Sequence, residues 1–243
     1  MNKKSIAVSL LIIFLCGCEK DKLVAITDNP VNADLFVVYD GMKNTTSGTA
    51  IFWNANRSKR LIFHGAAKLL FEGYPMEYRS TDYSYTKELI QFYSEPTFTI
   101  TDVNDETFIN SISFNSIELP QQYLDTIPDT INTSQALSIQ WLKKDGAMGI
   151  LSTGMPLDTG ETVTLRIETD SSPVETATAR QVTIGSSSVT FAVEDFNTLN
   201  KKGWATLALE RTKVLNRLPD PLGGGTGTIT AQYISLKRLV YLK

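Results

Sequence analysis

Short segments in which every second residue is apolar recur along most of this chain. The clearest are 162–167, 188–193 and 205–209, where apolar side chains alternate with polar or small ones. A period of two residues is that of a β-strand with one buried face and one solvated face. From Leu23 onward the sequence shows no heptad repeat and no long amphipathic helix. The pattern predicts an all-β chain built from sandwiches.

The candidate strands fall into two groups of similar size, which favours two immunoglobulin-like β-sandwich domains of about 100 residues over one large domain. We place the first sandwich at residues 31–117 and the second at residues 136–243. Residues 118–135 between them contain two prolines and little that could pack, so we expect a linker there. The expected strands are 34–39, 48–54, 60–63, 68–71, 74–78, 96–101, 108–114, 136–142, 149–152, 163–168, 176–184, 189–193, 204–211 and 229–242.

Two local patterns refine this picture near the end of the chain. Residues 195–203 begin with Asp195 and end with two lysines and Gly203, which predicts one short helix. In residues 229–242 the apolar positions change phase, and a strand that does so within one sheet predicts a β-bulge near Tyr233.

The N-terminus carries a targeting signal. A basic head precedes the apolar run Ile6–Leu15, and its ten residues are half of the roughly 20 that a membrane-spanning helix needs. Residues 1–17 therefore form an expected signal peptide. The following Leu15-Cys16-Gly17-Cys18 resembles the lipobox of bacterial lipoproteins. This resemblance implies a lipidated Cys18 as the first mature residue, with 18–30 as a tether; an ordinary secretory signal with a chance cysteine is the alternative.

The sequence after the lipobox refines the expected location. Cys18-Glu19-Lys20-Asp21 is similar to the start of outer-membrane lipoproteins of the Bacteroidota group, which implies lipid anchoring in the outer membrane, at the cell surface or at the periplasmic face. Cys16 would leave with the signal peptide and the Cys18 sulfur would carry lipid. The mature fold would then have no disulfide and would be stable from its cores alone.

The net charge and the composition of the chain argue against several classes of function. The 23 Lys and Arg against 26 Asp and Glu give a net charge of −3, and −5 once the signal peptide with Lys3 and Lys4 is removed. A negative chain is an unfavourable partner for nucleic acid. His64 is the single histidine, so zinc sites built on His or Cys and a Cys–His pair are excluded. We expect no catalytic residues, no metal and no cofactor.

Two loops contain residues that could suggest a ligand site. Asp102, Asn104, Asp105 and Glu106 gather oxygen ligands, but the glycine of a dedicated Ca²⁺ loop is missing, so a β-turn is favoured over an ion site. The glycine-rich segment 223–228 is followed by neither a lysine nor a helix, so we expect a mobile loop and not a phosphate site.

Aromatic residues supply the candidate ligand-binding surface. Tyr74, Tyr78, Tyr83 and Tyr85 occur at strand spacing and could form a flat platform for sugar rings, or fill the core. For the tryptophans Trp53, Trp141 and Trp204 the core is favoured, although they could extend such a platform.

Two threonines are candidate glycosylation sites. Thr126 and Thr130 each follow an aspartate and precede an isoleucine, a pattern resembling the O-glycosylation site of Bacteroidota proteins.

Together these features predict a non-catalytic, lipid-anchored envelope protein that binds a glycan or an outer-membrane protein partner. The alternative is a structural or adhesive, fimbria-like subunit that assembles by β-strand exchange. An enzyme ranks last, because no catalytic group stands out.

Overall fold

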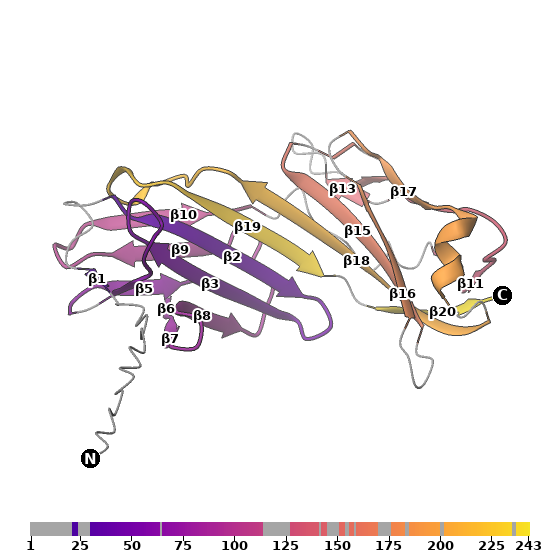
Figure 1. Ribbon diagram of the computed structural model, residues 1–243, viewed down its shortest axis with the longest axis horizontal. Coiled ribbons are helices and arrows are strands. Elements are labelled where there is room, and N and C mark those ends of the chain that lie inside the picture. Colours follow the sequence, from indigo (N-terminus) through magenta and orange to yellow (C-terminus); the bar gives the residue numbers. More distant parts are fainter. Residues whose placement is uncertain are drawn as a thin grey trace, which may run out of the picture.

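The computed structural model describes residues 21–23, 30–63, 65–113, 127–140, 142–144, 151–153, 156–157, 159–169, 176–182, 185–199, 202–234 and 237–243. In this part of the chain the secondary structure is almost entirely β, with two short 3₁₀ helices, η1 (Val193–Thr198) and η2 (Leu222–Gly224). The strands form two β-sandwiches that lie end to end (Figure 1). The expected all-β fold is thus confirmed. The short helix predicted at 195–203 corresponds in part to η1, which is a 3₁₀ helix that begins at Val193 and ends at Thr198.

The first sandwich has two facing sheets around one core. One layer contains β19 (Gly227–Ile234), β2 (Asn32–Asp40), β3 (Thr45–Trp53), β8 (Ser84–Leu89) and β7 (Glu77–Arg79). The other contains β10 (Thr107–Ser111), β9 (Thr97–Thr101), β5 (Lys68–Phe71) and β6 (Tyr74–Pro75). Alternate residues of these strands point inward, as the period of two requires, and Leu35, Phe52, Phe71 and Phe98 fill the space between the sheets. A short parallel pair, β1 (Asp21–Leu23) with β4 (Leu61–Phe63), lies beside them.

The second sandwich is built in the same way. Its larger layer contains β11 (Thr130–Ile131), β20 (Arg238–Leu242), β18 (Gly203–Leu215), β15 (Glu161–Thr169) and β16 (Thr176–Val182). The core lies between this layer and the pair β12 (Leu137–Gln140) and β17 (Ser188–Phe191), with Phe196 of η1 closing one side. A further hairpin joins β13 (Leu142–Lys144) to β14 (Leu151–Thr153).

One long strand, β18, belongs to both sandwiches. Its residues 203–207 pair with β20, its residues 205–213 pair with β15, and its residues 210–215 pair with β19 of the first sandwich. Figure 1 shows this orange strand running from the second sandwich into the first. The large layers of the two sandwiches are therefore one continuous ten-stranded sheet.

The two cores do not divide the chain at residues 118–135, where the sequence predicted the division. Leu218, Leu222, Ile229 and Ala231 lie in the first core, although they fall within 136–243. The chain leaves the first sandwich between residues 113 and 127, returns along β18, and crosses again between residues 234 and 238. Residues 118–126 lie outside the described part.

The second half of the expected linker is packed. Ile127, Ile131 and Thr133 are buried, and β11 pairs in parallel with β20. Residues 127–135 are thus part of the second sandwich and do not form a solvated connection.

The bulge predicted near Tyr233 is wrong. The pairing of β19 with β2 runs without interruption from residue 227 to residue 234. The apolar phase changes because Ile229 and Ala231 face the first core, whereas Val240 and Leu242, on a separate strand, face the second.

Candidate functional site

The four candidate tyrosines lie in the first sandwich, on both of its sheets. Tyr85 is only 6% exposed; its hydroxyl accepts a hydrogen bond from the Phe63 N–H at 2.7 Å, and burial raises its pKa. Tyr78 is its register partner on β7, and the two ring centroids are 5.3 Å apart. Tyr83 is half-buried in the preceding turn, with a φ of 55°. Tyr74 is exposed, but it belongs to β6 in the opposite sheet. The structure therefore brings Tyr78 and Tyr85 together, and it places Tyr85 in the core.

The three tryptophans, for which the core was favoured, have different outcomes. Trp53 is half-buried at the edge of a polar cluster, and Trp141 lies outside the described residues. Trp204 is 61% exposed, so its expected place in the core is wrong. The reason is its position on β18: Ala205, Leu207 and Leu209 face the core, so Trp204 must face solvent on the opposite side of the strand.

Trp204 is the centre of an exposed aromatic site on the second sandwich. Its register partner on β20 is Tyr241, which is 39% exposed, and the two rings meet edge to face with centroids 5.4 Å apart and an interplanar angle of 79°. Leu239, two residues before Tyr241 on the same face, is 59% exposed. We call Trp204, Tyr241 and Leu239 the aromatic corner.

Polar groups border the aromatic corner on the same face of the sheet. Thr206 pairs with Leu239 on one side and with Glu168 on the other. The Glu168 carboxylate contacts Arg166 Nε at 2.5 Å and Lys237 Nζ at 3.3 Å. On the other side of Tyr241 lies Thr130 of β11, which is exposed. The corner thus combines apolar ring surface with hydroxyl, carboxylate and cationic groups.

Sequence reasoning missed most of this site. Leu239, Tyr241 and Glu168 did not stand out as motifs, because they come from two strands about 70 residues apart in the sequence. The signal that could have found them is strand phase: Val240 and Leu242 are the buried positions of β20, so Leu239 and Tyr241 must point outward.

Other predicted sites have the following places. Thr130 is exposed in β11, while Cys18, His64 and Thr126 lie outside the described residues. The Asp102 side chain is buried and accepts the backbone N–H groups of Asn104 and Glu106 at 2.8 and 3.0 Å, which shapes the turn between β9 and β10. No group of three His, Cys, Asp or Glu that could hold a metal occurs among the described residues.

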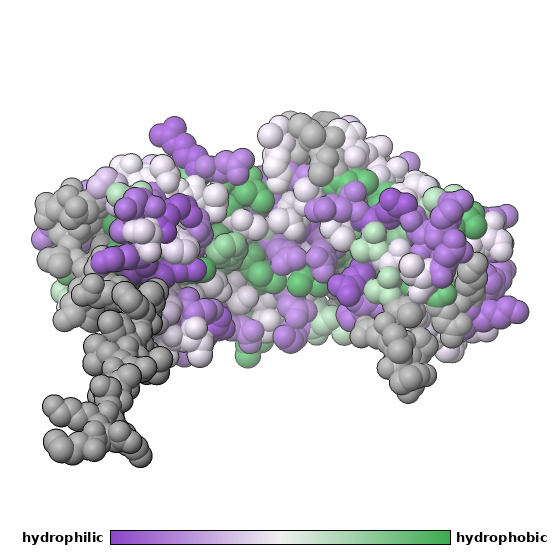
Figure 2. All heavy atoms as spheres, viewed as in Figure 1, coloured by the Kyte–Doolittle hydropathy of each residue, from purple (hydrophilic) through white to green (hydrophobic). Residues whose placement is uncertain are grey.

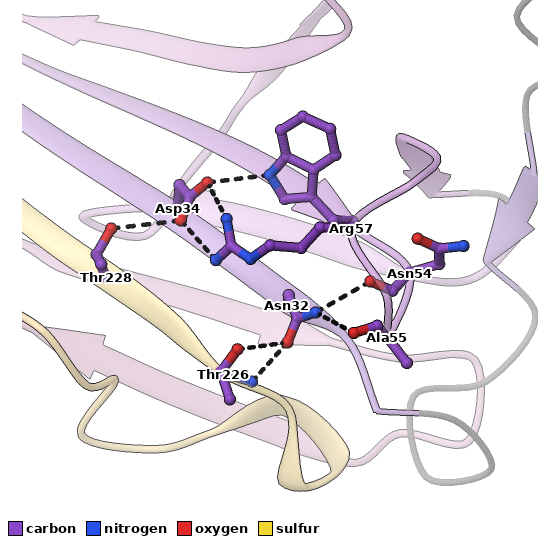
Figure 3. Close-up of polar contacts among 8 residues, drawn as sticks. Asn32, Asp34, Asn54, Ala55, Arg57, Thr226 and Thr228 are labelled. Carbon is purple, nitrogen blue, oxygen red and sulfur yellow. Dashed lines mark hydrogen bonds and ion pairs between the residues drawn. The ribbon is translucent and has the colours of Figure 1, made fainter.

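A second polar cluster lies where β2 begins (Figure 3), at the end of the molecule away from β20 (Figure 1). The Asp34 carboxylate accepts two hydrogen bonds from the Arg57 guanidinium, both at 2.9 Å, and one from the Trp53 indole at 3.0 Å. Burial by itself would raise the pKa of Asp34, but these hydrogen bonds and the Arg57 charge lower it below its usual value. Arg60 stacks on the Trp53 ring at 3.4 Å.

Neighbouring contacts extend this cluster to the glycine-rich segment. Asn32 accepts hydrogen bonds from the N–H and hydroxyl of Thr226 and donates to the carbonyl oxygens of Asn54 and Ala55 (Figure 3). Gly225 passes so close to Val31 that a Cβ would lie 2.0 Å from its carbonyl oxygen. The segment is therefore held by specific contacts, in contrast to the mobile loop expected from its composition. Since Asp34 and Arg57 bond each other, we assign the cluster a structural role.

The face of the molecule in Figure 2 carries hydrophobic residues in several separate areas with hydrophilic residues between them. No broad apolar band runs along this face. Within the described residues, no helix has the length and apolar character needed to cross a membrane.

Comparisons with known proteins add little to this geometry. No protein-family model and no curated protein matches the chain. Among solved structures, it is similar to the crystal structure of DIP-gamma IG1+IG2, with 7% sequence identity, a TM-score of 0.23, and coverage of 85% of this chain and 98% of that chain. A TM-score this low carries no argument about function, so the sandwich architecture rests on the strand pairing described above.

Proposed function

We propose that this protein is a non-catalytic, lipid-anchored lipoprotein of the outer membrane that binds a glycan or a protein partner through the outer face of its second sandwich. The observation that carries the proposal is the aromatic corner. An exposed Trp beside an exposed Tyr and Leu is costly to leave in water, and such apolar patches on soluble domains commonly serve binding.

The position of the corner supports an anchored binding protein. The chain enters the first sandwich at the start of β2, at one end of the elongated body, whereas β20 and the C-terminus lie at the other end (Figure 1). A lipid on Cys18 would hold the first end at the membrane. The aromatic corner would then point away from the bilayer, toward partners.

The anchor is tested by cell fractionation. Cys18→Ala should move the protein from the membrane fraction to the soluble fraction, because several buried acyl chains at about 0.8 kcal/mol per CH₂ would be lost. Cys16→Ala is the matched control and should stay in the membrane fraction. A membrane-bound Cys18→Ala protein would contradict the lipid anchor.

The binding face is tested by cross-linking in intact cells followed by purification of a tagged copy. Trp204→Ala and Tyr241→Ala should each reduce the captured partner several-fold, since truncation of a central aromatic commonly costs more than 1 kcal/mol of binding. Ile109→Ala, on an exposed apolar position of the first sandwich, is the control and should capture as much as the natural protein. Equal capture by all variants would exclude this face.

The alternative, a fimbria-like subunit, receives less support from the strand order. β19 lies between β18 and β2, and β20 lies between β18 and β11, so both C-terminal strands have neighbours on each side. Donation of either strand to another molecule would first break two ladders of hydrogen bonds. A ladder of cross-linked copies in the same experiment would favour the structural role over the binding role.

We also propose Thr130 as a glycosylated residue, together with Thr126. Thr130 is exposed and directly follows the exposed side chain of Asp129. Intact mass measurement of the purified protein should show a glycan mass that Thr130→Ala lowers and Thr133→Ala, on a buried threonine, leaves unchanged.

A further inference from the structure

We infer that the ligand of the aromatic corner is a carbohydrate, bound by a sugar ring that lies on the exposed face of Trp204. This inference rests on the proposed binding function and names the chemical class of the partner. It follows from the size of the corner, from the groups that border it and from the geometry of its rings.

The corner is too small for a stable protein interface. A buried aromatic side chain contributes about 150–250 Å², so three partly exposed side chains offer on the order of 300 Å². A stable protein complex buries roughly 800 Å² on each partner. An area of this size instead fits one or two sugar rings, and the surroundings of the corner are polar and charged, as the contacts of Glu168 show.

The border supplies the hydrogen-bonding groups that sugar hydroxyls require. Each hydroxyl of a sugar both donates and accepts, so a binding site needs donors and acceptors beside an apolar surface. Glu168 offers acceptor positions beyond its two ion-pair contacts, Lys237 has three N–H donors, and Thr206 has a hydroxyl that can do either. Glu168 is paired with both Arg166 and Lys237, so a neutral sugar can bind beside it without leaving a carboxylate unpaired, and the three groups together carry a single positive charge.

The rings themselves suit a sugar. One face of a pyranose presents C–H groups that carry partial positive charge, and the face of an aromatic ring is negative. Trp204 and Tyr241 meet nearly at right angles, so the Trp204 face can carry the sugar while Tyr241 bounds it on one side. Both residues sit on paired strands, which keeps the entropy cost of ordering them on binding low.

The test is calorimetric titration of the full mature protein with neutral hexasaccharides of glucose, mannose, xylose and galactose. At least one should bind, and Trp204→Ala should weaken its binding about tenfold, which corresponds to 1.4 kcal/mol. Trp204→Phe should retain part of the affinity, and Ile109→Ala should retain all of it. Far-ultraviolet circular dichroism should be the same for every variant, because the side chain is exposed.

The outcomes separate this inference from the proposed function. Absence of binding to all four hexasaccharides, with partner capture in cells that still depends on Trp204, would overturn the carbohydrate and leave the binding face intact. Sugar binding that Trp204→Ala does not weaken would also overturn the inference. If Trp204→Ala weakened neither sugar binding nor partner capture, both the carbohydrate inference and the proposed binding face would be wrong.

Discussion

Asp34 is a single residue that joins three parts of the first sandwich. It lies on β2, accepts hydrogen bonds from Trp53 at the end of β3 and from Arg57 in the following loop, and contacts the hydroxyl of Thr228 on β19 at 3.3 Å. Arg57 has a φ of 56°, a left-handed conformation that costs roughly 1–2 kcal/mol outside glycine. The ion pair with Asp34 offsets part of that cost.

We predict that Asp34→Asn lowers the free energy of unfolding at pH 7 by about 1–2 kcal/mol, because hydrogen bonds to a charged group are lost and the pair is partly screened by solvent. The folded-state pKa of Asp34 lies below its unfolded value, so its contribution is present above about pH 4 and disappears as the pH falls through the folded pKa. Urea unfolding of both proteins from pH 7 to pH 2.5 checks this. A difference that stays constant over that range would contradict the assignment.

For single residues, the sequence predicts burial or exposure in some cases and not in others. The alternation of Ala205, Leu207 and Leu209 was enough to place Trp204 outside, but the general preference of tryptophan for cores argued against it. For Tyr85 the sequence left a surface platform and the core open, and the structure places it in the core, where its hydroxyl accepts a hydrogen bond from the Phe63 N–H. Hydrogen-bond partners that lie 22 residues away cannot be read from local composition.

Among the strands, β18 is the one that connects the two sandwiches. Its residue Thr212 pairs with Thr162 of β15 and with Gln232 of β19, so Thr212 has strand neighbours on both sides. At this point the strand passes from one sandwich to the other. Backbone hydrogen bonds there join the two sandwiches through one shared strand.

We predict that Thr212→Pro destabilises the protein by about 3 kcal/mol or more, because proline removes a ladder hydrogen bond in the middle of a sheet. Thr212→Val keeps the β-branched shape and should change the free energy of unfolding by less than about 1 kcal/mol. Thermal unfolding of the two variants checks this. Similar melting temperatures for both would show that the crossing contributes little.

The existence of most strands was predictable, but their partners were not. Segments such as 162–167 and 205–209 are recognisable as strands from their alternation of apolar and polar residues, and they form part of β15 and part of β18. The phase change after Tyr233 was visible too, yet the sequence alone suggested a bulge within one strand. Only the assignment of β19 and β20 to different cores explains it, and that assignment depends on pairing with β2, which is almost 200 residues away in the chain.

The described part of the molecule consists of two sandwiches that share one sheet, and neither core is formed by one continuous segment. The first core uses residues from 31–112 and 218–231, and the second uses residues from 127–209 and 240–242. A cut between residues 113 and 127 would therefore separate residues 218–231 from the rest of the first core, while the second core would keep all its residues.

We predict that residues 31–117 expressed alone do not fold, because they lack Leu218, Leu222, Ile229 and Ala231, each of which is nearly or fully buried in the first core. Proton NMR of this fragment should show the narrow amide dispersion of an unfolded chain. The full chain should unfold in one calorimetric transition, whereas two separate transitions would show that the sandwiches are independent.

The place of β19 has a consequence for biogenesis. A chain that emerges from a ribosome or a translocation pore with its N-terminus first exposes β2 as an unpaired edge until residues 227–234 arrive. The first sandwich therefore cannot fold as an independent domain early in synthesis. It can be completed only when nearly the entire polypeptide is available.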